Sequence, residues 1–253
     1  MRLRCALLVL ALAATAQADW TIVSSSTDGG RDGVTHKHVI LENAPERERV
    51  AVDLAVFSTK TCTLRLVQNE NGARSLDEAM NNEQSLAGVN GGYFDEAFAP
   101  IGLRIANGEM IAPLKRARLI TGVLVASARG VQIIRAREFA RRPGITTAIQ
   151  CGPFLVDLAK PIGGLNSGSR ARRTFVATTN GNLALLGLSS RVSLAELSKI
   201  LVTPLLGDGL KIERALNLDG GSSSGFWFAR ENGSVFSIPE QKPVRDFVAL
   251  VPR

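Results

Sequence analysis

Short runs in which apolar and polar residues alternate occur along most of the chain and predict strands. Period-two alternation puts successive side chains on opposite faces of a strand. The first three runs are His36–Leu41, Val50–Phe57 and Cys62–Gln68. Residues 19–33 are rich in Gly, Asp and Ser and lack this alternation. We therefore expect residues 19–33 to be a loosely held entry to the fold.

Turn dipeptides between apolar runs predict hairpins. An Asn-Gly pair tolerates positive φ at both positions, as a two-residue hairpin turn requires. The clearest case joins Thr174–Thr179 to Asn182–Leu188, and Arg129-Gly130 predicts a further hairpin. The Asn-Gly pairs are Asn107-Gly108, Asn180-Gly181 and Asn232-Gly233.

Two short helices are predicted by capping boxes, in which a Ser oxygen accepts from a free N–H and a Glu reaches back. One begins at Ser75 and runs to about Ser85, and the other begins at Ser193 and runs to about Val202. Each is followed by a short apolar strand. The pattern predicts one α+β domain with a mixed or antiparallel sheet core and a few flanking helices.

A double-glycine turn follows each of these two strands, as Asn90-Gly91-Gly92 and Asp219-Gly220-Gly221. Paired glycines allow positive φ and leave the backbone N–H groups open to an anion. Three hydroxyls, from Ser222 to Ser224, follow the second turn. The alternative interpretation is two tight turns with ordinary Asn and Asp turn residues. We expect Asn90, Arg173 and Asp219 to converge on one pocket whose floor is formed by both turns.

The composition narrows the class of protein. The 253 residues are 45% hydrophobic and 21% charged, which excludes collagen-like, disordered and coiled-coil chains. The net charge of +7 permits nucleic acid as a partner, but only 5% of residues are aromatic and the basic residues are scattered. Because nucleic-acid platforms stack bases on aromatic rings, anionic saccharides are the better match.

The N-terminus has the layout of a secretory signal peptide. Two arginines in Met1–Arg4 precede the apolar run Cys5–Ala14, and Ala16-Gln17-Ala18 is a small-x-small cleavage pattern. The run is too short for a stable membrane anchor. We predict a signal peptide at residues 1–18 and a periplasmic or secreted domain at residues 19–253, without stable membrane insertion.

The cysteines and histidines decide whether a disulfide or a metal site is expected. We predict that Cys62 and Cys151 pair in an oxidising compartment, the alternative being two separately buried thiols. His36 and His38 share one face of a predicted strand, which we interpret as an exposed face rather than half a metal site. We expect no metal and no cofactor, because C-x-x-C and a third His are lacking.

Several of these segments together resemble the phosphodiester glycosidase family. Val89–Asp95 resembles its N-G-G-F-F segment with Tyr93 for a Phe, and Cys151–Val156 its G-P-x-L strand. Ala215–Ser223 is similar to its A-L-N-L-D-G-G-G-S-S signature, with Ser222 at the third Gly. The R-T strand matches Arg172-Arg173-Thr174, and Pro243-Val244-Arg245 fits the C-terminal edge. The resemblance covers roughly residues 50–253.

The resemblance implies an exported hydrolase that cleaves the sugar C1–O bond of a sugar-1-phosphodiester related to a glycan or envelope exopolysaccharide. A phosphate leaving group with a second pKa of about 6 departs with little acid assistance. Asp219 would be the base or oxocarbenium stabiliser, and Arg173 rather than Arg172 would clamp the phosphate. Other expected contacts are the N–H groups of Gly91, Gly92, Gly220 and Gly221, with Asn90, Thr174, Ser222 and Ser223.

Alternatives remain at this point. A non-catalytic saccharide-binding module would keep the same residues, and a broader phosphodiesterase would break the P–O bond instead of the C1–O bond. Asp95 is either a second carboxylate or, as we favour, a turn cap. Arg141, Arg142 and Arg172 are interpreted as solvated surface charge.

Overall fold

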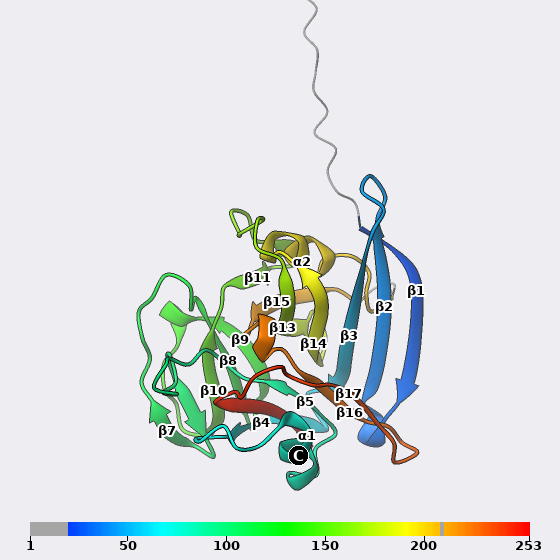
Figure 1. Cartoon of the computed structure of the whole chain (residues 1–253). Helices are drawn as coiled ribbons and strands as arrows, with labels where there is room; N and C mark the ends of the chain where they lie inside the picture. The colour runs from blue at the N-terminus through cyan, green and yellow to red at the C-terminus, as the bar shows by residue number, and fades with distance from the viewer. Residues whose placement is uncertain (1–19, 208–209) are drawn as a thin grey trace, which may run out of the picture.

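Three antiparallel sheets form most of the protein in this computed structural model, which describes residues 20–207 and 210–253 (Figure 1). The predicted signal peptide at 1–18 lies outside the described residues. The predicted α+β class holds in a β-dominated form, because the described chain has two α-helices, α1 (Leu76–Asn82) and α2 (Leu194–Ile200), beside the sheets. No helix in the described part of the chain is long and apolar enough to cross a membrane.

The first sheet has eight strands in the order β1-β2-β3-β14-β13-β15-β11-β12. Its long β1–β3 ribbon lies along the right of Figure 1. The bounds are β1 Trp20–Gly29, β2 Thr35–Asn43, β3 Glu48–Ser58, β11 Phe154–Asp157, β12 Lys160–Pro161, β13 Ala171–Thr179, β14 Leu183–Val192 and β15 Ile212–Asn217.

The other two sheets have five strands each, in the orders β7-β6-β10-β8-β9 and β17-β16-β5-β18-β4. The second consists of β6 Arg104–Ala106, β7 Glu109–Ala112, β8 Gly122–Ser127, β9 Gly130–Arg135 and β10 Ile145–Cys151. The third consists of β4 Cys62–Gln68, β5 Ala87–Asn90, β16 Phe226–Ala229, β17 Val235–Ile238 and β18 Asp246–Pro252.

The main core lies where the three sheets meet. It contains Val176 and Leu186 of the first sheet, Leu124 of the second and Val248 of the third. Alternate residues of the first sheet, such as Leu185, point to the opposite face and pack beneath α2. Helix α1 covers the outer face of the third sheet. The first sheet is therefore buried on both faces, so its central strands are continuous apolar runs.

The turn and cap predictions hold in the structure. Both capping boxes form, with the Ser75 oxygen accepting from the Glu78 N–H and the Ser193 oxygen from the Glu196 N–H. The Asn107-Gly108 turn has positive φ at both residues, 50° and 83°, and joins β6 to β7. The hairpins at 129–130, 180–181 and 232–233 also form.

The expectation of a loosely held entry at residues 19–33 is wrong. Trp20–Gly29 is a full edge strand, β1, paired along its length with β2. Most of its side chains are exposed, so no apolar alternation marks the strand in the sequence. Backbone hydrogen bonds to β2 hold it instead, which a hydrophobic pattern cannot reveal.

The interpretation of His36 and His38 as an exposed face is wrong for His36. Only 3% of the His36 side chain is exposed, and its ring packs against three phenylalanines of β16 and β17. One carboxylate oxygen of Asp53 lies 2.9 Å from His36 Nε2 and 2.8 Å from His38 Nδ1. The neighbouring β17 hairpin and β1 bury this face, which the strand pattern alone did not show.

The predicted Cys62–Cys151 disulfide is also wrong. Both residues are free thiols with side chains inside the main core. Burial raises the pKa of both thiols, that of Cys151 to about 12, so the reactive thiolate is disfavoured.

This burial gives a direct test on purified residues 19–253. We expect no reaction of the native protein with a thiol reagent over minutes, because neither thiol is exposed or ionised. Two thiols per chain should titrate after denaturation without a reductant. Fewer than two would show that the cysteines are oxidised.

Candidate active site

The two double-glycine turns lie against each other although they come from different sheets. The Asp219 N–H donates to the Gly91 carbonyl at 3.1 Å. The Asn90 side-chain amide donates to the Asp219 carbonyl at 2.8 Å. Asn90 ends β5 in the third sheet, and Asp219 follows β15 in the first. The structure thus brings together residues that are far apart in sequence.

Asn90 is fully buried and bonded on both sides of its amide. Its Oδ1 accepts from the Thr174 hydroxyl at 2.6 Å and from the Gly225 N–H at 3.1 Å. The two turns, β13 and the start of β16 therefore share one side chain. Because its polar atoms are occupied within the protein, Asn90 holds the turn rather than facing a ligand, and so does Thr174.

The first glycine pair is closed to a ligand, contrary to the expectation that its N–H groups receive an anion. The Gly91 N–H donates to the Asp246 carbonyl at 2.8 Å, and the Gly92 N–H to Asp246 Oδ1 at 2.9 Å. A Cβ on Gly91 would lie 1.8 Å from Asp246 Oδ1, and one on Gly92 2.1 Å from Arg104 Nη2. Glycine is required here because a buried ion pair packs directly against the turn.

Arg104 and Asp246 form this ion pair with almost no exposure, 1% and 2%. Arg104 Nε donates to Asp246 Oδ2 at 2.8 Å. The remaining guanidinium nitrogens donate to carbonyls of Leu103, Gln150 and Tyr93, each at 3.1 Å. A buried charge is tolerated only when it is paired and hydrogen-bonded, as both charges are here. The pair joins the second and third sheets behind the first turn.

The Asp219 carboxylate is partly exposed at the second turn. Its Oδ1 accepts from the Gly220 N–H at 2.9 Å. Burial raises the pKa of this carboxyl, and the nearby Asp246 charge raises it further. The Ser223 hydroxyl and the Lys242 ammonium group oppose the rise. Asp219 is therefore a carboxylate whose ionised form is costly, which is common at functional sites.

Arg173 lies on the Asp219 side of β13. Its Nη1 would be 3.7 Å from a Cβ on Gly220, and burial lowers its pKa. Its Nε and Nη2 donate to the carbonyls of Val192 and Ser169, at 3.1 and 2.7 Å. Arg172 instead donates to the Pro239 carbonyl. Arg173 is thus fixed by the backbone with one nitrogen directed to the second turn.

Buried polar atoms without partners gather at the second turn. The Ser223 and Ser224 hydroxyls and Asn217 Oδ1 have no hydrogen bond in the described part of the chain. The Ser223 hydroxyl lies close enough to Asp219 to affect its pKa, but not in hydrogen-bonding geometry. Ser222 is exposed, and Gly221 has φ of +66°. Such orphaned atoms call for a bound polar group or water.

Three groups near Asp219 were missed as functional candidates. Lys242 lies on the segment after β17, which is tied to the turn by the Gln241 N–H donating to the Ser222 carbonyl at 2.7 Å. The Tyr93 hydroxyl donates to the Gly152 carbonyl at 2.7 Å and accepts from Asn217 at 2.9 Å. Asp246 directly follows the Pro243-Val244-Arg245 segment that resembles the family. Its position next to a family motif could have indicated a role. Asp95 caps a turn by accepting from the Ala99 N–H.

A partly buried carboxylate with a guanidinium and an ammonium group around it is typical of sites that act on anionic substrates. The phosphodiester glycosidase family matches residues 83–251, more than half of the chain. The chain therefore belongs to the phosphodiester glycosidase family, which also confirms the resemblance seen in its motifs.

Solved structures share the fold. One is the zebrafish N-acetylglucosamine-1-phosphodiester alpha-N-acetylglucosaminidase catalytic domain auto-inhibited by pro-peptide, with TM-score 0.64 and 13% identity over 95% of this chain and 85% of that one. Another is a hypothetical protein from Synechocystis, with TM-score 0.62 and 15% identity over 91% of this chain and 64% of that one. No curated protein sequence matches.

The ion pair behind the first turn should dominate stability. Arg104→Met removes one partner and leaves the Asp246 carboxylate buried and unpaired, which costs about 3–5 kcal/mol of unfolding free energy. Arg49→Met, which breaks an exposed pair with Glu42, should cost at most about 1 kcal/mol. Urea denaturation measures both. Equal losses in the two variants would contradict the assignment.

Asp219 should lower stability at neutral pH. Because its folded pKa is raised above the ordinary 3.8, the ionised form opposes folding above that pKa, and this cost disappears as the pH falls below 3.8. Asp219→Asn should therefore be at least as stable as the wild type at pH 7, and the difference should close in acid. Urea denaturation across pH measures it, with the exposed Asp95→Asn as control. A less stable Asp219→Asn at pH 7 would contradict the prediction.

Proposed function

We propose that the mature chain is an exported hydrolase that cleaves the sugar C1–O bond of a sugar-1-phosphodiester. The observation that carries the proposal is the partly exposed Asp219 carboxylate beside unpartnered polar atoms, with Arg173 and Lys242 close by. Membership of the phosphodiester glycosidase family supports this class of reaction.

One carboxylate can be sufficient for this reaction. Water adds to C1 while the C1–O bond breaks, and the bond's electron pair leaves with the phosphate oxygen. Because the phosphomonoester has a second pKa of about 6, it leaves without full protonation. Asp219 is suited to stabilise the positive charge that develops at C1 and to accept the proton of the attacking water.

Two cations are placed for the phosphate. Arg173 directs one nitrogen toward Gly220, while its other nitrogens are fixed by backbone carbonyls. Lys242 lies near enough to Asp219 to lower its pKa. A preorganised guanidinium and a mobile ammonium group can together neutralise the departing phosphate. The exposed Ser222 hydroxyl is suited to bind a sugar or phosphate oxygen, and the Ser223 and Ser224 hydroxyls are buried beside it.

Asn90 and Thr174 have a positioning role in this proposal. Asn90 fixes the Asp219 main chain and accepts from Thr174, so the two residues set where the carboxylate stands. The Gly91-Gly92 pair serves the same purpose through Asp246. The Gly220 N–H also donates within the protein, to Asp219 Oδ1. Among the described residues, the Gly221 N–H is therefore the backbone donor that the two turns leave for an anion.

The proposed setting is the periplasm or the extracellular space. The N-terminal signal-peptide pattern supports export, and the net charge of +7 supports an anionic saccharide as substrate. The reaction as written uses the chain's own side chains and water and requires no cofactor.

The bond that breaks distinguishes this proposal from a phosphodiesterase. We expect the purified residues 19–253 to hydrolyse UDP-N-acetylglucosamine or another sugar-1-phosphodiester. In water enriched in heavy oxygen, the label should enter the free sugar, as C1–O cleavage requires. Label in the phosphate would identify P–O cleavage and overturn the proposal. Binding without turnover of any such substrate would identify a saccharide-binding module.

Variants test the assigned roles. Asp219→Asn keeps the shape and removes the charge, so kcat should fall at least about a hundredfold. Arg173→Lys loses the planar fork, so KM should rise more than kcat falls. The matched control Asp95→Asn should retain wild-type turnover. Unchanged kcat in Asp219→Asn would remove Asp219 from the reaction.

A further inference from the structure

Three adjoining cavities surround the segment between β9 and β10 of the second sheet, whereas Asp219 follows a strand of the first sheet. Their volumes are about 590, 540 and 500 Å³. Phe139 lines the first and second cavities, and the 142–145 segment lines the first and third. The three cavities adjoin through these shared lining residues, and we term them together the basic groove.

The basic groove is strongly cationic. The residues that line it include seven basic residues and one acidic residue, Glu138. Two of these cations are ion-paired, Arg135 with Asp157 and Arg137 with Glu138. Because Arg141 and Arg142 line this cationic surface, their interpretation as simple solvated charge is incomplete. The basic residues are Arg129 and Arg142 in the first cavity, Lys115, Arg116, Arg135 and Arg137 in the second, and Arg141 in the third.

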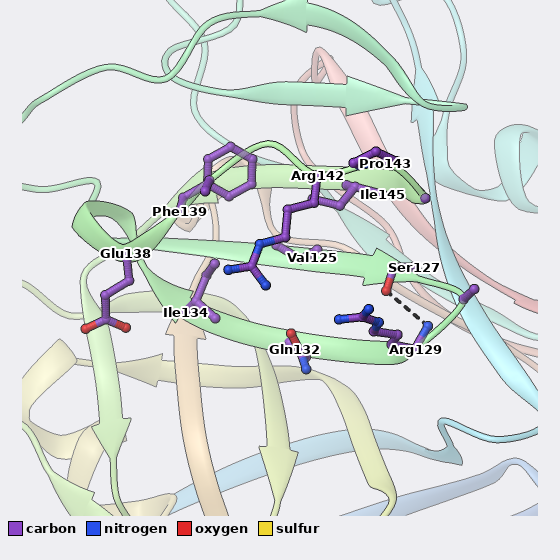
Figure 2. A pocket seen from close by; sticks show the side chains of 13 residues that line it. Val125, Ser127, Arg129, Gln132, Ile134, Glu138, Phe139, Arg142, Pro143 and Ile145 are labelled. Atoms are coloured by element: carbon purple, nitrogen blue, oxygen red, sulfur yellow. Dashed lines mark hydrogen bonds between the residues drawn. The ribbon is translucent and has the colours of Figure 1, made fainter.

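Several of these cations are available to a ligand. The guanidinium groups of Arg129 and Arg142 have no hydrogen bond or ion pair with any residue that the structure describes. Figure 2 shows both reaching over strands β8 and β9, from the turn and from the opposite wall. Val125 and Ile134 also line the first cavity and give it an apolar surface, which we call its apolar floor.

The walls of the basic groove are fixed by buried contacts. The Gln150 side chain accepts from the Lys115 N–H at 3.0 Å, and donates to the carbonyls of Lys115 at 2.6 Å and Ile120 at 3.1 Å. Both ends of the exposed 115–120 loop are therefore held by one buried amide. The backbone that carries Lys115 and Arg116 is therefore ordered before binding, which reduces the entropy that this loop loses when a ligand binds.

We propose that the basic groove binds a segment of an acidic polysaccharide, with guanidinium forks on its carboxylate or phosphate groups and sugar rings over the apolar floor. Repeated anions match cations spaced over three cavities, and Phe139 offers one ring for a sugar face. A single aromatic residue is too few for a base-stacking nucleic-acid surface. This binding does not depend on hydrolysis at Asp219.

Direct binding by the mature protein tests the proposal. The probe is fluorescein-labelled oligogalacturonate, followed by fluorescence anisotropy at low salt, with neutral labelled dextran alongside. We expect oligogalacturonate binding that weakens with salt and no dextran binding. The variant Arg129→Gln/Arg142→Gln should lose at least about tenfold in affinity, because two charge-assisted contacts are removed.

A matched variant separates a site from general charge attraction. Arg31→Gln/Arg191→Gln removes the same charge from exposed arginines outside the basic groove and should retain wild-type affinity. Equal losses in both variants would overturn the proposal, as would tighter binding of labelled single-stranded DNA at the same residues. Hydrolysis of a small sugar-1-phosphodiester should be unchanged in Arg129→Gln/Arg142→Gln, so a failure of the proposed function leaves the binding result interpretable.

Discussion

The buried pair of Arg104 and Asp246 is the interaction on which the site geometry depends. It places a guanidinium and a carboxylate in the interior and satisfies them with main-chain groups from three segments. The two glycines of the first turn exist to let this pair approach the backbone. Since Asn90 immediately precedes these glycines and bonds Asp219, the ion pair indirectly fixes the second turn as well. The charge of Asp246 also reaches Asp219 and raises its pKa.

The two double-glycine turns are similar in sequence but have different roles in the structure. The first faces inward, with its N–H groups bonded to Asp246 and its asparagine fully buried. The second is partly exposed, has orphaned hydroxyls beside it and holds the carboxylate. Only the second turn is open to a ligand, and the first turn holds the second in place. This asymmetry is the reason that we give Asn90 a positioning role and Asp219 a chemical one.

The cationic side chains also fall into two groups, one at the Asp219 site and one on the second sheet. The carboxylate site has a few cations held by specific contacts, such as Arg173 on two carbonyls. The second sheet instead carries cations over open cavities, several of them without partners among the described residues. If both proposals hold, one surface retains an anionic polymer while the other performs hydrolysis.

The sequence by itself determined the local structure and the candidate chemistry. Capping boxes and Asn-Gly turns depend on residues close in sequence, and apolar alternation marked the strands at His36–Leu41, Val50–Phe57 and Cys62–Gln68. The L-D-G-G-S-S motif was specific enough to indicate the family. Tertiary structure alone decided which groups meet. The β1 strand is held by backbone bonds that leave no hydrophobic pattern, and the two cysteines are free thiols buried in the main core. Arg104 and Asp246 are 142 residues apart, and only the docking of two sheets makes their charges partners.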